Sequence, residues 1–437
     1  MNSSSIAALR LGALGLALSQ AFSPSAWAAT EAERIAVLEK QIQANNALIA
    51  QLAARLNQLE HAPAAAPAAT PDAAAQASRI DAIEQTVSQI VDAENNSKTA
   101  NNGVPLHGFS DVRYAYSGKP VADGRKKGMA LGNLDLYLTP DLGGRVKSLL
   151  ELNFEYGDAG TLGTDLERLQ LGYTFSDALT VWAGRFHTPY GYWNTAFHHG
   201  AQIQTSVDRP RMIDFEDGGG ILPAHTVGIW GTGQVRLGNG KLAYDAYLGN
   251  GGRVLDGILD FNAVKDDNGN SMVGASVRYH FGGAADGLVL GAHAFNEDVS
   301  AYSGALRASS TRIRMAGAYA YYDANDWEVI SEYYHFRNRA LEPNGATRAS
   351  WSGFLQVGKL LDSGFTPYVR WEKAALDQQD AYFAALDSGR SYVRQAIGVR
   401  YDLTPKMALK LQLSHSDDSQ DGGAKYREAQ LQAAIRF

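Results

Sequence analysis

The sequence predicts an all-β protein: a 16-stranded antiparallel transmembrane β-barrel preceded by a short α-helical coiled coil. Polar and apolar side chains alternate from residue 104 onwards, which is the pattern of strands with two unlike faces. The connections between the alternating segments are short and long in turn, as in outer-membrane barrels. The chain also closes on an alternating segment that ends in Phe437. A terminal Phe on such a segment is typical of the signal that barrel proteins present to their assembly machinery.

Residues 1–28 have the composition of a secretory signal peptide. Arg10 supplies positive charge, residues 11–18 form an apolar stretch, and Ala-Trp-Ala at residues 26–28 matches a cleavage site. The apolar stretch is too short to cross a bilayer as a helix. We therefore expect the mature chain to begin near Ala29 and to lie outside the cytoplasm.

Residues 29–60 carry the 3.5-residue repeat of a coiled coil. The seam positions are spaced alternately by three and four residues: Ile35, Leu38, Ile42, Asn45, Ile49, Leu52, Leu56 and Leu59. Ile and Leu at the two seam positions favour a dimer, and the polar Asn45 favours one register. The same spacing returns at Ile80, Ile83, Val87 and Ile90, where β-branched residues favour more than two chains, so the number stays open. The segment is predicted to join copies of this chain, or to bind a cell-wall or periplasmic partner. A helix that docks on its own barrel is the alternative.

Two further segments separate the coiled coil from the barrel. Residues 61–78 are rich in Ala and Pro and should form an extended, semi-rigid spacer. Residues 79–103 are predicted to form a second short helix and a polar linker. The barrel is predicted to occupy residues 104–437.

The turn signals divide the barrel segment into sixteen strands of about 10–13 residues, long enough to cross a bilayer at a tilt. Short turns are expected near residues 140–141, 176–177, 239–240, 282–287, 323–326, 362–364 and 404–405. Longer loops are expected at 118–128, 157–163, 188–224, 250–270, 297–310, 338–348, 376–389 and 418–425.

The charged faces distinguish a membrane barrel from a soluble β-sandwich, which shows the same alternation. Arg312 and Arg314 share one face of their segment, as do Arg394 and Arg400. A sandwich would bury one face of every strand, and burying unpaired charge is costly. A water-filled lumen removes this cost. The apolar faces then contact lipid, where only a closed barrel satisfies every backbone polar group.

Composition excludes several other classes of protein. The 437 residues include no cysteine, so disulfide scaffolds and thiolate metal sites are excluded. The net charge of −7 argues against a nucleic-acid-binding protein. No G-x-S-x-G element or H-E-x-x-H pair is present. We therefore predict neither an enzyme nor a cofactor.

Alternation places a set of basic side chains on the predicted lumen wall, where they would lower the barrier for anions. They are Arg145, Lys147, Arg168, Arg236, Arg278, Arg312, Arg314, Arg370, Arg394 and Arg400. In the alternative interpretation, acidic wall residues neutralise these side chains and hold the wall together. Those acidic residues are Glu151, Glu155, Asp245 and Glu372.

The longest predicted connection, residues 188–224, is expected to fold into the lumen and narrow it. Its charged residues are Arg209, Arg211, Asp214, Glu216 and Asp217, with Asp208 beside them. The aromatic residues of the loop, Tyr190, Tyr192, Trp193 and Phe197, could form a track for sugars or simply pack the loop against a wall. His187, His198, His199 and His225 lie in or beside the loop, but their spacing matches no metal motif, so no metal site is predicted.

The order of signal peptide, coiled coil, linker, 16-stranded barrel and terminal Phe437 resembles a Gram-negative outer-membrane porin. It is similar to the superfamily of phosphate-selective porins O and P, and the coiled coil before the barrel resembles the DcaP-like dicarboxylate porins. The resemblance covers the architecture of the whole chain and no ligand motif.

The resemblance implies a homo-trimer in the outer membrane, in contact with lipid and lipopolysaccharide, with the coiled coil in the periplasm. It implies passive diffusion of small hydrophilic solutes, preferentially anions. A sugar-facilitating porin is one alternative. A structural tether or adhesin that uses the barrel only as an anchor is another.

Overall fold

The computed structural model describes residues 106–119, 127–156, 162–198, 200–214, 220–260, 265–343 and 345–437. The predicted signal peptide, coiled coil, spacer and second helix lie outside these residues, as do the seam positions from Ile35 to Leu59. Glu216 and Asp217 of the long loop also lie outside them, as does His199.

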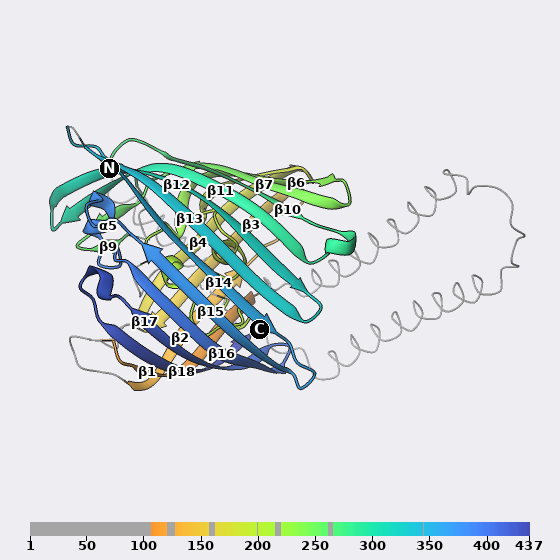
Figure 1. The fold of residues 1–437 in the computed structure, drawn as a ribbon. Coiled ribbons are helices and arrows are strands. Elements are labelled where there is room, and N and C mark those ends of the chain that lie inside the picture. Colours follow the sequence, from red (N-terminus) through yellow and green to blue (C-terminus); the bar gives the residue numbers. More distant parts are fainter. Residues whose placement is uncertain are drawn as a thin grey trace, which may run out of the picture. The chain divides into compact units, whose positions relative to one another are not determined.

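Within the described residues, sixteen antiparallel strands pair in a closed ring, as predicted (Figure 1). Each strand pairs with the next one in the ring, and β1 pairs back onto β18 through Phe109↔Arg436 to Ser117↔Glu428. The first seven strands are β1 (Leu106–Ser117), β2 (Lys127–Leu138), β3 (Val146–Tyr156), β4 (Leu162–Ser176), β5 (Leu179–His187), β6 (His225–Leu237) and β7 (Gly240–Gly249). The remaining nine are β10 (Met272–His280), β11 (Leu288–Ser303), β12 (Leu306–Ala324), β13 (Trp327–Ala340), β14 (Thr347–Lys359), β15 (Phe365–Ala375), β16 (Tyr392–Thr404), β17 (Met407–Asp417) and β18 (Lys425–Arg436).

Short elements lie in the connections. A hairpin of β8 (Arg253–Leu255) and β9 (Ile258–Leu259) follows β7, and β8 pairs with the end of β11. The helices are α4 (Trp193–Ala196) and α5 (Ala381–Ala385), and the 3-10 turns are η2 (Arg211–Ile213), η3 (Gly283–Ala285) and η4 (Ser419–Asp421). Among the described residues, no helix is long and apolar enough to cross a bilayer.

The strands turn their apolar side chains outwards, the reverse of a soluble protein. In β17, Leu409, Leu411 and Leu413 are 40%, 39% and 49% exposed. The alternating Lys410 and Gln412 are only 2% and 1% exposed. Because a strand sends successive side chains to opposite faces, one face of β17 is apolar and exposed while the other is polar and enclosed. An apolar outer face around a polar interior is the arrangement of a membrane barrel.

The two rims differ in the length of their connections. Every predicted short turn joins two strands, and the shortest are the two-residue links at 177–178, 238–239, 325–326 and 405–406. The predicted loop 297–310 is wrong, because β11 and β12 continue through it to a two-residue turn at 304–305. The polar residues of this stretch have the composition of a loop. The polar side chains instead cover an extension of the hairpin, and β8 supplies a further pairing partner for β11.

A β-bulge in β4 brings two charged neighbours to the lumen face. Glu151 of β3 pairs with Arg168, but Leu152 pairs with Leu166, so Glu167 is an extra residue in β4. A bulge of this kind redirects a side chain that strict alternation would send outwards. Glu167 is consequently buried beside Arg168 rather than exposed on the opposite face.

One side of the lumen is filled with apolar side chains. The long loop, the β8–β9 hairpin and α5 pack there against the inner faces of β10–β16, and we call this region the apolar half. Its largest fully buried members are Tyr190, Trp193, Phe186, Met212, Ile213, Leu222, Leu259, Met272, Tyr334, Phe336 and Phe383.

The apolar half explains two departures from the predicted orientations. Ile313 and Met315 of β12 pack into it, so the intervening Arg314 and the neighbouring Arg312 face away from the lumen, contrary to the prediction. Tyr319 follows the same inward face as Ile313 and Met315 and is 6% exposed. An apolar face of a strand therefore does not identify the lipid-facing side where the lumen itself is packed with apolar side chains.

Candidate functional site

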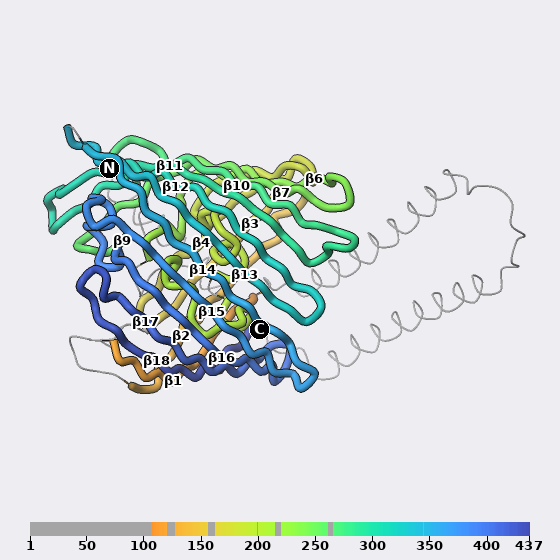
Figure 2. Tube along the Cα trace, viewed as in Figure 1, coloured from red at the N-terminus to blue at the C-terminus, as the bar shows by residue number. Residues whose placement is uncertain are grey.

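The described residues of the connection between β5 and β6, which are 188–198, 200–214 and 220–224, lie inside the ring of strands (Figure 2). Its first anchor is the carboxylate of Glu332 on β13. Glu332 Oε1 accepts hydrogen bonds from the backbone N–H of Tyr192, at 3.1 Å, and of Trp193, at 2.7 Å, where α4 begins. Gly191 precedes them with a φ of 62°, and a β-carbon there would overlap Glu332 and the hydroxyl of Tyr334. Only glycine permits this approach of the loop to the wall.

The second anchor is Arg370 of β15, whose side chain is fully buried. Its Nε donates to Glu372 Oε1 at 2.8 Å. Its Nη1 donates to the Ser206 hydroxyl at 2.9 Å and to the Asp208 carbonyl at 2.8 Å. Nearby, the ammonium of Lys410 on β17 donates to the carbonyls of three loop residues, Ala201, Gln204 and Ser206. Cationic wall side chains therefore satisfy the buried carbonyls of a loop that has no regular structure of its own there.

The third anchor is the carboxylate of Asp208, near the middle of the loop. Its Oδ2 accepts from Arg394 of β16 at 2.6 Å and from the side-chain amides of Gln412 and Gln430 at 2.7 and 3.0 Å. Burial opposes ionisation of this carboxyl, but the guanidinium groups of Arg394, Arg113 and Arg370 together outweigh it and hold the pKa of Asp208 below its usual range. The first half of the loop is thus fixed to the wall at several points between Tyr192 and Asp208.

Beside the loop, a cavity of about 250 Å³ remains open, and we call its lining the charged half of the lumen. It lies between the loop and the inner faces of β1, β2, β16 and β18. Among the described residues, five cationic and four anionic side chains line it: Arg113, Lys119, Arg209, Arg211, Arg394, Asp111, Asp208, Asp214 and Glu428. The three described members of the predicted constriction set, Arg209, Arg211 and Asp214, therefore lie together in this lining.

The walls on either side of the loop carry opposite excesses of charge. The inner faces of β2–β4 carry five carboxylates, Asp135, Glu151, Glu155, Asp165 and Glu167, against Lys147 and Arg168. The inner faces of β15–β18 carry Arg370, Arg394, Arg400 and Lys410, against Glu372, Asp402 and Glu428. Opposed charges across a narrow lumen set up a transverse field that orients polar solutes.

The predicted basic wall residues fall into three groups. Arg168, Arg278, Arg370, Arg394 and Arg400 face the lumen, and each forms an ion pair. Three of these pairs, with Glu151, Asp245 and Glu372, are those of the neutralisation interpretation.

The second group lies at the short-turn rim: Arg145 in the turn before β3, and the exposed strand-end residues Lys147 and Arg236. Arg312 and Arg314 form the third group, on the outer face. Arg312 binds both carboxylate oxygens of Asp298, at 2.7 and 2.8 Å.

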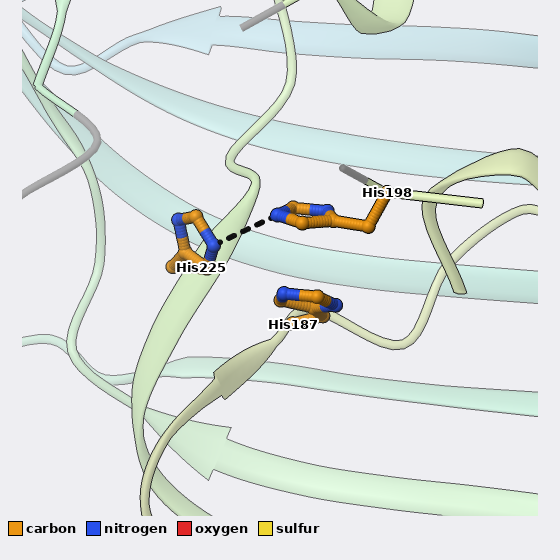
Figure 3. A group of neighbouring side chains, drawn as sticks. All are labelled: His187, His198 and His225. Carbon is orange, nitrogen blue, oxygen red and sulfur yellow. Dashed lines mark hydrogen bonds between the residues drawn. The ribbon is translucent and has the colours of Figure 1, made fainter. Parts of the chain in front are cut away.

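Three of the histidines lie together at the root of the loop, which the spacing in the sequence did not predict (Figure 3). His187 ends β5, His225 begins β6, and His198 follows α4. The rings of His187 and His198 stack with centroids 3.3 Å apart, and Nε2 of His198 lies 3.1 Å from Nε2 of His225. No local spacing in the sequence indicates this group, because His187 and His225 lie at the two ends of the long connection and meet His198 only when the connection folds back.

The aromatic residues of the loop are mostly enclosed. Tyr190 and Trp193 are each 1% exposed and Phe197 is 8% exposed, all within the apolar half. Tyr192 is partly exposed and stacks on Tyr321 with centroids 4.0 Å apart. These rings pack the loop against the wall, so the structure favours packing over a sugar track.

The sequence matches no known family profile and no curated protein sequence. Solved structures are similar in fold. An anion-selective porin from Comamonas acidovorans aligns with a TM-score of 0.55 at 15% identity, over 77% of this chain and 99% of that chain. The fold is that of a porin barrel.

Two further solved structures align less closely. The outer membrane channel DcaP of Acinetobacter baumannii has a TM-score of 0.49 at 11% identity, over 76% of this chain and 97% of its own. The trimer form of OmpT from Vibrio cholerae also has a TM-score of 0.49, at 10% identity, over 77% of this chain and 99% of its own.

Proposed function

We propose that this protein is an outer-membrane porin through which small hydrophilic solutes, preferentially anions, diffuse passively. The observation that carries the proposal is the cavity in the charged half of the lumen. It is lined by polar and charged side chains, whereas the apolar half of the lumen is filled by packed apolar ones. A solute that crosses the barrel would pass along this side of the loop 188–224, which acts as the constriction.

The preference for anions rests on the balance of charge at the constriction. The described lining holds one more cationic than anionic side chain. Arg394 is the cation held deepest in it, and it contacts Asp208 and Glu428 at 2.6 and 3.3 Å. A small excess of fixed positive charge in a narrow, partly desolvated passage raises the local concentration of anions.

The proposed location in the outer membrane rests on the apolar outer surface of the barrel and on the different lengths of the connections at its two rims. The apolar outer face requires lipid, and in bacterial barrels the short turns face the periplasm while the longer loops face outwards. Both ends of the barrel sequence, at Leu106 and Phe437, reach the short-turn rim. We therefore place the coiled coil of residues 29–60 in the periplasm, where it would join three barrels or bind a periplasmic partner.

The test is single-channel conductance in a planar bilayer, with the reversal potential measured in a salt gradient. We expect steady conductance and an anion-to-cation permeability ratio above one. Arg394→Gln should shift that ratio several-fold towards cations, because it leaves Asp208 and Glu428 without their shared cation. The matched control is Arg337→Gln, since Arg337 is exposed and alternates with the inward-facing Phe336 and Asn338 of β13.

Each outcome is decisive for one part of the proposal. Cation selectivity of the unaltered protein would contradict the proposed anion preference, but the proposal that the protein is a channel would stand. If correctly folded protein gave no conductance, the proposal of a channel would be overturned and the structural tether would be favoured. Deletion of residues 30–60 tests the coiled coil, because loss of trimers on a native gel would support its role in assembly, while unchanged trimers would assign it to partner binding.

A further inference from the structure

The three clustered histidines share their position with a buried carboxylate. Glu167 Oε2 lies 2.7 Å from Nε2 of His225 and 3.9 Å from Nε2 of His198, and these two nitrogens are 3.1 Å apart. One ring nitrogen from each of the three histidines lies within 4.8 Å of the others. In a tetrahedral zinc site, with zinc–nitrogen bonds of 2.0–2.1 Å, neighbouring ligand atoms lie about 3.3 Å apart. The triangle of His198, His225 and Glu167 already has edges of this size.

The cluster is enclosed and held in place. Glu167 is 1% exposed, and the side chains of His225 and His198 are 1% and 5% exposed. His198 has a φ of 22°, which a residue with a β-carbon rarely adopts. Such a backbone persists when the surrounding structure imposes it, and it is concentrated at functional sites.

The strands explain why these groups meet. β4 pairs with β5 as far as Leu169↔Arg185, whereas its pairing with β3 continues to Tyr156↔Leu162. The ends of β5 and β6 therefore leave the wall here and carry His187 and His225 into the lumen with the loop. The bulge in β4 presents Glu167 to them.

The surroundings supply partners for the ring nitrogens and negative charge for a dication. Nδ1 of His198 lies 3.4 Å from the side-chain oxygen of Asn194, and Nε2 of His187 lies 3.4 Å from Glu151. Such outer partners orient metal-binding imidazoles. The adjoining wall of β2–β4 carries five carboxylates against two bases, so an added dication reduces the net charge of this region.

We propose that His187, His198, His225 and Glu167 bind one divalent transition-metal ion of the zinc class, which ties the constriction loop to the wall of the barrel. Imidazole and carboxylate ligands at these separations suit Zn²⁺. The ion would join β4, β5, β6 and the loop at one point. The three anchors of the loop described above lie on β13 and β15–β18, so this would be a fourth anchor on the opposite wall.

Metal binding requires two local rearrangements. The rings of His187 and His198 stack with centroids 3.3 Å apart, so one of them must turn before a nitrogen of each can point at the same ion. The side chain of Arg185 must also move. Arg185 Nη2 lies 3.2 Å from Nδ1 of His225, and a guanidinium can only donate there. His225 must carry its proton on Nδ1 to offer Nε2 to a metal, so the guanidinium of Arg185 has to move off this nitrogen. Its Nε can keep its bond to the carbonyl of Glu167 at 3.0 Å.

The experiment uses the full chain, folded in detergent, stripped with a chelator and then dialysed against Zn²⁺ or Co²⁺. We expect about one Zn²⁺ retained per chain by elemental analysis, and the visible absorption bands of four-coordinate cobalt with Co²⁺. Paired His198→Ala and His225→Ala substitutions should lower retention more than about tenfold, and Glu167→Gln should weaken it with little change in shape. The control is His335→Ala, because His335 is exposed and alternates with the inward-facing Tyr334 and Phe336.

Metal retention is measured without conductance, so the experiment tests the metal site independently of the proposed channel. Heat-modifiable migration on gels checks that each variant is folded, and Glu167→Gln serves if the paired histidine variant does not fold. No retained metal in the unaltered protein would overturn the proposal. Retention unchanged by both the paired histidine variant and Glu167→Gln would overturn it equally. Arg185→Gln should bind Zn²⁺ more tightly, and weaker binding in a folded variant would remove His225 from the ligand set.

Discussion

The apolar half and the charged half of the lumen are built from strands with the same alternation, yet their interiors are opposite in character. On the side of β10–β15, inward positions hold residues such as Ile330, Phe336 and Phe354, packed against the loop. On the side of β1, β16 and β18, inward positions hold residues such as Asp111 and Arg394 around an open cavity. The difference shows that the position of one loop decides which part of the wall is a packed core and which is a passage.

Different interactions predominate along different parts of the loop. Apolar burial acts on α4 and the aromatic residues around it, and it depends on close packing. Charge-assisted hydrogen bonds from Arg370, Arg394 and Lys410 act on the irregular part of the loop, where they satisfy buried carbonyls and a carboxylate. Substitutions in the two halves should therefore have separable effects on stability and on permeation.

The largest expected effect is on the apolar half. Trp193→Ala removes a ring that is 1% exposed and packs edge-on against Phe197 and Phe354. We expect the free energy of unfolding to fall by about 3–5 kcal/mol, because the cavity can only partly collapse. Denaturant unfolding of the detergent-folded protein measures it. Trp371→Ala is the control, since that ring is 44% exposed and leaves no enclosed cavity, and equal losses from the two variants would contradict the packed half.

A smaller effect is expected at the point where the loop reaches β13. Gly191→Ala should cost about 1–3 kcal/mol, because a β-carbon at this positive φ displaces Glu332 from the two backbone N–H groups that it accepts. Gly422→Ala provides a matched control, since its φ is also positive, at 78°, but a β-carbon there contacts nothing. A loss no greater than that of the control would show that the contact with Glu332 contributes little.

In the charged half, acid should release the anchor at Asp208. Its pKa is lower in the folded protein than in the unfolded chain, so its contribution to stability is complete above about pH 4. The contribution is lost as the pH falls from about 4 through the lowered pKa, because the unfolded chain then binds the proton first. Asp208→Asn should abolish this part of the pH dependence of unfolding. An acid transition that is identical in the variant would assign it to other carboxyls.

The smallest effect is expected at the mouth of the cavity. Lys119 is exposed and lines it, so Lys119→Ala should lower the anion-to-cation permeability ratio by less than about twofold, and less still at high salt. Lys359→Ala is the comparison, because Lys359 lies over Trp327 on another part of the barrel. An effect as large as that of Arg394→Gln would move the selective point from the constriction to the mouth.

The strand number, the short turns and the closed barrel were predictable because each depends on neighbours in the sequence. Alternation over about ten residues indicates a strand, and turn residues between such segments indicate the connections. The loop 297–310 was mispredicted because polar residues that form an extended hairpin have the composition of a loop. Arg312 and Arg314 were placed in the lumen because alternation gives two faces without saying which of them meets water.

The sequence by itself determined that sixteen alternating segments close into a ring with an apolar exterior, because the lipid-facing pattern recurs locally in every strand. Tertiary structure alone decided where the lumen is open and which groups meet across it. The path of residues 188–224 buries Trp193 on one wall, sets Asp208 against Arg394 on another, and brings His198 to His187 and His225. Those contacts join residues far apart in the chain, and their partners are fixed by packing and charge in three dimensions rather than by any spacing along the sequence.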